Sequence, residues 1–183
     1  MLGSLVFINF NPDYHNTTIS AHEEVEGIID FLKVTLMWLT HLPHSAREAA
    51  HFTCCSKVAS GLMEYILSNK VGMINYICIA SFDVDCKRLE AFADECAIPH
   101  LGQCFAEFHD LIKALLFPDM TQLVDNIAMR RNVFPRLDPM KLCTLMEKIT
   151  PLPLGAMIPG LPRPDRNILR GYVKKLRAQL YTR

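Results

Sequence analysis

The sequence predicts an all-α protein, an antiparallel bundle of six or seven helices joined by short connections. Apolar residues recur through most of the chain at the three- and four-residue spacing of an amphipathic helix, and no alternating strand pattern follows residue 10. Half of the 183 residues are hydrophobic and 21% are charged, so the chain has enough apolar side chains to form a globular core.

Two helices are predicted to meet at Pro43, because a proline ends the helix that precedes it. The first, over residues 23–42, is apolar on most of its circumference and should therefore be covered by more than one neighbour. The second, over residues 46–68, is predicted to begin with a capping box formed by Ser45 and Glu48. Small side chains near its start favour close approach of the two backbones. We expect this hairpin to be the heavily buried centre of the bundle.

Further helices are predicted from apolar spacing and from capping or breaking residues. Their expected ranges are 73–97, 101–115, 119–131 behind an Asp119 cap, 139–149 behind an Asp138 cap with Pro139 first, and 166–180 behind an Asp165 cap. The segment 150–164 contains five prolines and two glycines and is predicted to be an extended connector. Residues 1–22 lack helical periodicity and are expected to form an irregular arm that need not be native to the 23–183 bundle.

Motifs of catalysis and of nucleotide or cofactor binding are not recognisable, which predicts a non-enzymatic interaction protein without a cofactor. His51, Cys54 and Cys55 form the one tight cluster of metal-ligand types, but no second half has ligand spacing, so a metal site is not predicted. The seven cysteines are scattered at mostly apolar helical positions, which is typical of reduced core thiols in the cytosol.

One enzymatic alternative stays open. Cys104 could act as a nucleophile activated by His100 or His109, as in a thiol hydrolase. Cys104 lies in the most apolar helical stripe of the chain, however, where a cysteine is usually structural rather than reactive.

The charge distribution suggests a second kind of partner. The net charge is zero, which argues against nucleic-acid binding, but residues 163–183 hold seven Lys and Arg and one acid. A basic final helix predicts peripheral contact with an anionic membrane or an acidic protein face. The side chains expected to make this contact are Arg170, Lys174, Lys175 and Arg177. The alternative is an ordinary solvated helix face.

Five segments, in order, resemble one known family. They are IIDFLKVTLMWLTHLPHSA, SFDVDCKRLEAFA, the apolar helix 105–116, LDPMKLCTLMEKI and RPDRNILRGYVKKLRAQL. The family is the C-terminal region of the exocyst's Sec-fifteen-type subunit (exocyst complex component six). The resemblance covers about 25–180 and leaves residues 1–22 unmatched. Its T-H-L-P turn suggests that the hairpin joins this bundle to a longer helical rod.

The resemblance implies a vesicle-tethering role in exocytosis, without catalysis, in the cytoplasm and peripherally at secretory vesicles and the plasma membrane. It also implies binding to a GTP-bound Rab GTPase and to other exocyst subunits. An aromatic side chain beside mixed charges suits an interface with an apolar centre and a polar rim. We therefore expect the Rab contact on the outward face of helix 73–97, at Phe82, Asp83, Lys87 and Glu90. The alternative is that Phe82 lies in the core and that the charges are solvated.

Overall fold

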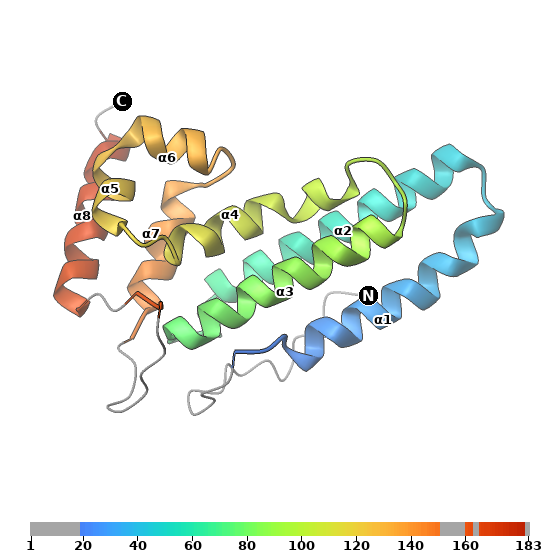
Figure 1. Ribbon diagram of the computed structural model, residues 1–183, viewed down its shortest axis with the longest axis horizontal. Helices are drawn as coiled ribbons and strands as arrows, with labels where there is room; N and C mark the ends of the chain where they lie inside the picture. Colours follow the sequence, from blue (N-terminus) through green and yellow to red (C-terminus); the bar gives the residue numbers. More distant parts are fainter. Residues whose placement is uncertain (1–18, 151–159, 163–164, 182–183) are drawn as a thin grey trace.

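The computed structural model describes residues 19–150, 160–162 and 165–181, and these residues are mainly helical (Figure 1). No strand occurs within these ranges, and the all-α prediction is confirmed. Most of the predicted arm and most of the proline-rich connector lie outside the described residues. The elements are α1 (Glu23–Met37), η1 (Trp38–His41), α2 (His44–Leu67), α3 (Tyr76–Glu95), η2 (Leu101–Phe105), α4 (Ala106–Leu115), α5 (Met120–Asp125), α6 (Ile127–Val133), α7 (Pro139–Lys148) and α8 (Arg166–Tyr181).

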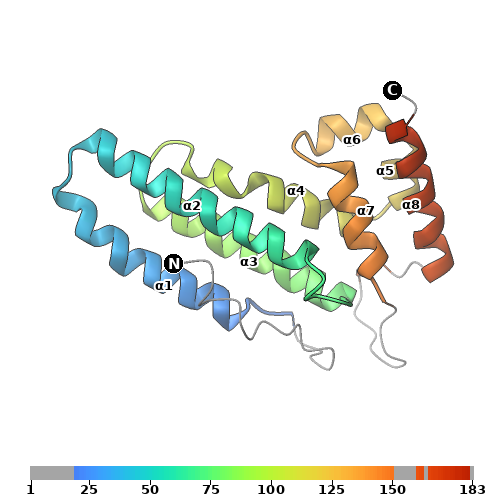
Figure 2. The same cartoon turned by 180° about the vertical axis from the view of Figure 1, so that it is seen from behind.

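The helices form two groups. Helices α1 to α4 lie along the long axis of the molecule, whereas α5 to α8 gather at one end (Figure 1 and Figure 2). The most deeply buried helix is α3, in which every residue from Tyr76 to Phe82 is buried. It therefore needs cover on nearly all sides, and it packs against α1 along one flank and against η2 and α4 along another.

Polar pairs fix α1 on α3. The pairs are His22 with Asp85, Glu26 with Arg88, and Lys33 with Glu95. The residues of each pair are 62 or 63 positions apart, and this constant offset means that the two helices run parallel. The fully buried Asp85 carboxylate accepts from the backbone N–H of His22 at 2.8 Å and lies 2.5 Å from the His22 ring. Two parallel bonds of 2.6 and 2.8 Å join Arg88 to Glu26.

The helical hairpin differs from the prediction. The chain does reverse at Pro43, but α1 approaches the backbone of α3 more closely than that of α2. The expected capping box is wrong, because Pro43 occupies the N-cap position of α2 and no side chain caps it. Ser45 lies within the first turn of α2, and Glu48 lies 3.3 Å from the ring of His44. The expectation of a heavily buried first arm is also wrong, since only one face of α1 is buried.

Two of the predicted caps are confirmed, and one predicted helix is divided. Asp119 caps α5, and Asp138 caps α7 with Pro139 in the first position. The helix predicted over 119–131 is two helices, because Asn126 has an extended backbone and its side chain accepts from Met129 N at 2.9 Å to start α6. Earlier in the chain, the helix predicted over 73–97 is a single helix, α3.

The end of α7 ties the two groups of helices together. A parallel bridge pairs Ile74 with Ile149, closed by bonds from Ile74 N to the Lys148 carbonyl at 3.0 Å and from Thr150 N to the Ile74 carbonyl at 2.8 Å. The Lys148 ammonium donates to two carbonyls at the end of α2, at 2.9 and 2.6 Å. Its burial lowers the pKa of Lys148, which is consistent with a structural position in the bundle.

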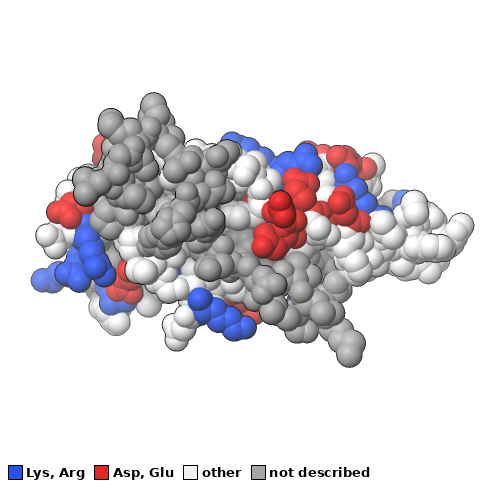
Figure 3. Space-filling view, turned by 90° about the horizontal axis from the view of Figure 1, so that it is seen from below, with Lys and Arg blue, Asp and Glu red and all other residues white. Residues whose placement is uncertain are grey.

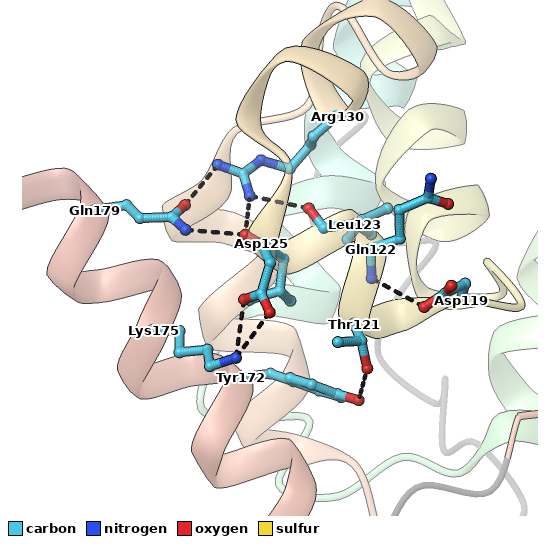
Figure 4. Close-up of polar contacts among 10 residues, drawn as sticks. Asp119, Thr121, Gln122, Leu123, Asp125, Arg130, Tyr172, Lys175 and Gln179 are labelled. Carbon is cyan, nitrogen blue, oxygen red and sulfur yellow. Dashed lines mark hydrogen bonds and ion pairs between the residues drawn. The ribbon is translucent and has the colours of Figure 1, made fainter.

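Polar contacts made by Arg130 and Gln179, which we call the clasp, hold the last helix, α8, against α5 (Figure 4). Arg130 is buried, and its guanidinium donates to the carbonyls of Leu123 and Val124 at 3.0 and 3.1 Å and to Gln179 Oε1 at 3.0 Å. Gln179 in turn donates to the Val124 carbonyl at 2.9 Å. Arg130 therefore satisfies the carbonyls that end α5 and joins them to α8. Its burial lowers the pKa of the guanidinium, although an arginine remains charged.

We expect Asp85→Ala to lower the free energy of unfolding by about 1–3 kcal/mol, because it leaves the His22 backbone N–H without this acceptor. Urea unfolding of the purified chain measures the change. Asp94→Ala is the matched control, because Asp94 is exposed on the same helix and should change stability by less than about 0.5 kcal/mol. Equal effects of the two substitutions would contradict the assigned role of Asp85.

We expect Arg130→Met to lower the free energy of unfolding by about 2–4 kcal/mol, because the three hydrogen bonds of the guanidinium are lost. Methionine largely replaces the apolar stem of the arginine, so the change tests the hydrogen bonds. Hydrogen exchange should show the loss of protection first in α8. The exposed neighbour Arg131 provides the control, and Arg131→Met should leave α8 unchanged. Retained protection of α8 in Arg130→Met would show that the clasp does not hold this helix.

Candidate interaction surfaces

The first predicted interaction residue, Phe82, belongs to the core. Its side chain is 1% exposed, and its ring packs at right angles to that of Phe108 with the centroids 6.1 Å apart. The His22 ring lies on another side, at 5.0 Å. Phe82 therefore presents no surface to a partner, and the alternative reading of this position as core is the one that the structure shows. The physical reason is that α3 is covered on both flanks at this level.

The three charged residues predicted on the same surface lie beside each other at the junction with α4. Asp83 and Lys87, four residues apart on α3, form an ion pair at 2.6 Å. The buried ring of His109 lies between Asp83, at 3.3 Å, and Glu90, at 2.6 Å. Both carboxylates therefore contribute to helix packing, and of the three only Lys87 has a mostly exposed side chain, at 62%.

A surface that was not predicted runs along the outer side of α1 and η1. We call it the α1 stripe, and it is formed by five large apolar side chains. These are Phe31 (50% exposed), Val34 (58%), Met37 (62%), Trp38 (73%) and Leu42 (44%). On the face that Figure 3 shows from below, acidic side chains lie near the start of α1, and few charged side chains lie at the end where the chain turns from α1 to α2.

The sequence contained a signal for this stripe. Phe31, Val34, Trp38 and Leu42 are separated by 3, 4 and 4 residues, which is one helical face of its own. The buried face of α1 uses a different set of positions, from Val25 to Leu36. A helix that is apolar all round can be enclosed by its own domain or can keep one face for a partner, and the sequence prediction considered only the first.

The basic face of α8 is partly neutralised within the fold. Lys175 bonds both carboxylate oxygens of Asp125 at 2.9 Å, and Arg177 pairs with Glu147 at 2.8 Å. Two of the four residues predicted to meet a membrane or an acidic partner therefore join α8 to α5 and α7. The other two, Arg170 and Lys174, are exposed and have no ion pair among the described residues.

The cysteine positions do not assemble a reactive site in the described part of the chain. His51 contacts the carbonyl of Arg47 at 2.7 Å, and burial raises the pKa of the Cys54 thiol and raises that of Cys55 to about 12. The Cys104 sulfur accepts from Ser56 at 3.4 Å. Both ring nitrogens of His109 face carboxylates instead of Cys104.

The described residues contain neither a candidate metal-binding group nor a candidate membrane-spanning helix. Within 19–150, 160–162 and 165–181, the His, Cys, Asp and Glu side chains form no group of three or more arranged to hold a metal ion. None of the helices in these ranges is long and apolar enough to cross a membrane.

Comparison with known proteins identifies relatives. The family model described as exocyst complex subunit Sec15 C-terminal matches residues 4–148. This match begins upstream of the segment in which the resemblance was found and ends before α8. Human exocyst complex component 6B is 23% identical over 134 residues, which are 70% of this chain and 16% of that protein.

Mouse exocyst complex component 6 is 23% identical over 146 residues, which are 75% of this chain and 18% of that protein. The chain therefore spans less than a fifth of the length of these relatives. No solved structure matches the chain significantly. Since the family model matches well over half of the residues, the chain belongs to the family of the C-terminal region of the exocyst subunit Sec15.

Proposed function

We propose that the chain is a non-enzymatic module of a vesicle tether in exocytosis, acting in the cytoplasm and peripherally at secretory vesicles and the plasma membrane. Its family membership supports the tethering role. The observation that carries the proposal is the α1 stripe, because soluble monomers rarely leave large apolar side chains contiguous and exposed. An interaction module that packs into a larger helical assembly explains this surface.

The occupant that we propose for the α1 stripe is a helix of another exocyst subunit. Membership of the exocyst subunit family implies assembly with other exocyst subunits, and such an assembly can supply the cover. Phe31 and Val34 on α1 and Trp38 at the start of η1 are exposed on successive turns of the chain, a pattern that suits packing against a facing helix. Glu23 is exposed in the first turn of α1, and Asp30 is exposed beside Phe31; neither has an ion pair among the described residues. Basic side chains on the partner helix would complement these acids.

We expect Trp38→Glu to weaken binding of the purified chain to purified exocyst subunits by about tenfold or more, because it places a charge in an apolar contact. Isothermal titration calorimetry measures the affinity. The fold should be unaffected, since Trp38 is 73% exposed. The matched control is Tyr181→Glu, because Tyr181 is an aromatic side chain that is 83% exposed at the end of α8. Unchanged affinity in Trp38→Glu would exclude the α1 stripe as the contact.

The finer proposal is that the chain binds a GTP-bound Rab GTPase through the surface around Asp83, Lys87 and Glu90. The resemblance to the family supports the kind of partner. Because Phe82 is buried, the apolar centre of this surface falls instead on the partly exposed Val84 and the exposed Ala91, one turn away from Lys87 on either side. A small apolar centre with a charged rim is consistent with a transient protein contact.

We expect Lys87→Glu to weaken binding to a GTP-loaded Rab by about tenfold, because it reverses the one mostly exposed charge of the predicted set. Pull-down with a panel of Rab proteins, each loaded with GTP or GDP, measures the interaction. Lys57→Glu, at an exposed position on α2, serves as the control. Equal binding to both nucleotide states, or no binding across the panel, would rule out the Rab proposal and leave the tether assembly proposal standing.

A further inference from the structure

We propose that the groove between the end of α7 and the first half of α8 binds an acidic amphipathic segment of a partner protein. The groove has a volume of about 470 Å³, and it is lined by apolar residues of both helices and by basic residues of α8. This proposal does not depend on the tether proposal, because it uses neither the α1 stripe nor the α3 surface.

The floor of the groove is apolar. It is formed by Met146 at the end of α7, Ile149 just after it, and Leu169 and Val173 on α8. Each of these side chains is at most 6% exposed, so the floor is part of the packed core and is rigid. A floor of this kind accepts one or two small aliphatic side chains and leaves the rest of a ligand at the rim.

The rim of the groove is a row of three cations. Arg166, Arg170 and Lys174 are four residues apart, so they line one face of α8, and all three are exposed. None has an ion pair among the described residues. Like charges at this spacing on a helix repel each other. An anionic ligand therefore relieves repulsion within the helix as well as gaining new contacts.

The chain itself supplies little negative charge to this row. Glu147 is the acid that lines the groove, and it pairs with Arg177 at 2.8 Å. The sequence between Ile149 and Pro164 contains no Asp or Glu, and Asp165, which precedes α8, is exposed and forms no ion pair with this row among the described residues. The cations at the rim are therefore best neutralised by a partner.

The shape of the site favours a protein segment over a membrane surface. A flat bilayer needs cations on a protruding face, but Lys175 and Arg177, which would extend such a face, are paired with Asp125 and Glu147. Figure 3 shows Lys and Arg side chains at the end of the molecule that α8 occupies. A helical ligand with Asp or Glu every fourth residue matches the spacing of the rim, and its aliphatic residues face the floor.

The test uses a fluorescein-labelled helical peptide with Glu at every fourth position and Leu on the adjoining face. Anisotropy should detect binding to the full chain that weakens as salt rises. The double variant Arg170→Glu with Lys174→Glu should bind at least about tenfold more weakly, because both positions are exposed and carry the rim charge. Arg131→Glu with Lys57→Glu, two exposed positions outside the groove, is the control with the same change in net charge and should bind normally.

Two altered peptides and a vesicle assay complete the test. A peptide with Gln in place of Glu should not bind, and one with Ser in place of Leu should bind more weakly, because the floor of the groove is apolar. Equal affinity of the rim and control variants, or no binding of the acidic peptide, would overturn the proposal. Binding of the rim cations to phosphatidylserine vesicles without binding to the peptide would also overturn it and assign the site to a lipid surface.

Discussion

The burial of α3 by neighbouring helices determines the arrangement of the rest of the structure. A helix whose residues from Tyr76 to Phe82 are all buried must be enclosed by several neighbours, and α1 and α4 supply much of that enclosure. Polar side chains set the register of both contacts: Asp85 binds His22 of the segment before α1, and His109 of α4 lies between two carboxylates of α3. Because α3 uses only one face of α1, the other apolar face of α1 remains exposed.

Local chemistry explains which parts of this fold were predictable. The caps at Asp119 and Asp138 depend on hydrogen bonds within one turn of their own helices, and both are present. Helix pairing depends on residues more than 60 positions apart, so the sequence did not reveal that α1 pairs with α3. Phe82 was predicted to lie at an interface, but it lies in the core. The prediction failed because an amphipathic pattern alone does not show how many neighbours cover a helix. The α1 stripe was not predicted for a related reason: the apolar residues of the helix before Pro43 were all expected to be buried.

Two of the three proposed binding surfaces, the α1 stripe and the groove between α7 and α8, lie toward opposite ends of the structure. The exposed side chains of η1 lie at the turn between α1 and α2, whereas α8 belongs to the helix group at the other end (Figure 1 and Figure 2). The contact between Lys148 and the end of α2 and the bridge at Ile149 join the two groups. An elongated module with a docking surface at each end can connect two components, which suits a role in a tether.

The central claim is that the α1 stripe is an assembly contact, and Trp38, the single tryptophan of the chain, reports on it directly. The measurement is the ¹⁹F NMR shift of 5-fluorotryptophan at this position, compared between H₂O and D₂O. In the isolated chain the resonance should respond to the solvent, because the indole is 73% exposed. After the other exocyst subunits are added, that response should be lost. A response that persists in the assembled tether, or one that is already absent in the isolated chain, would contradict the account.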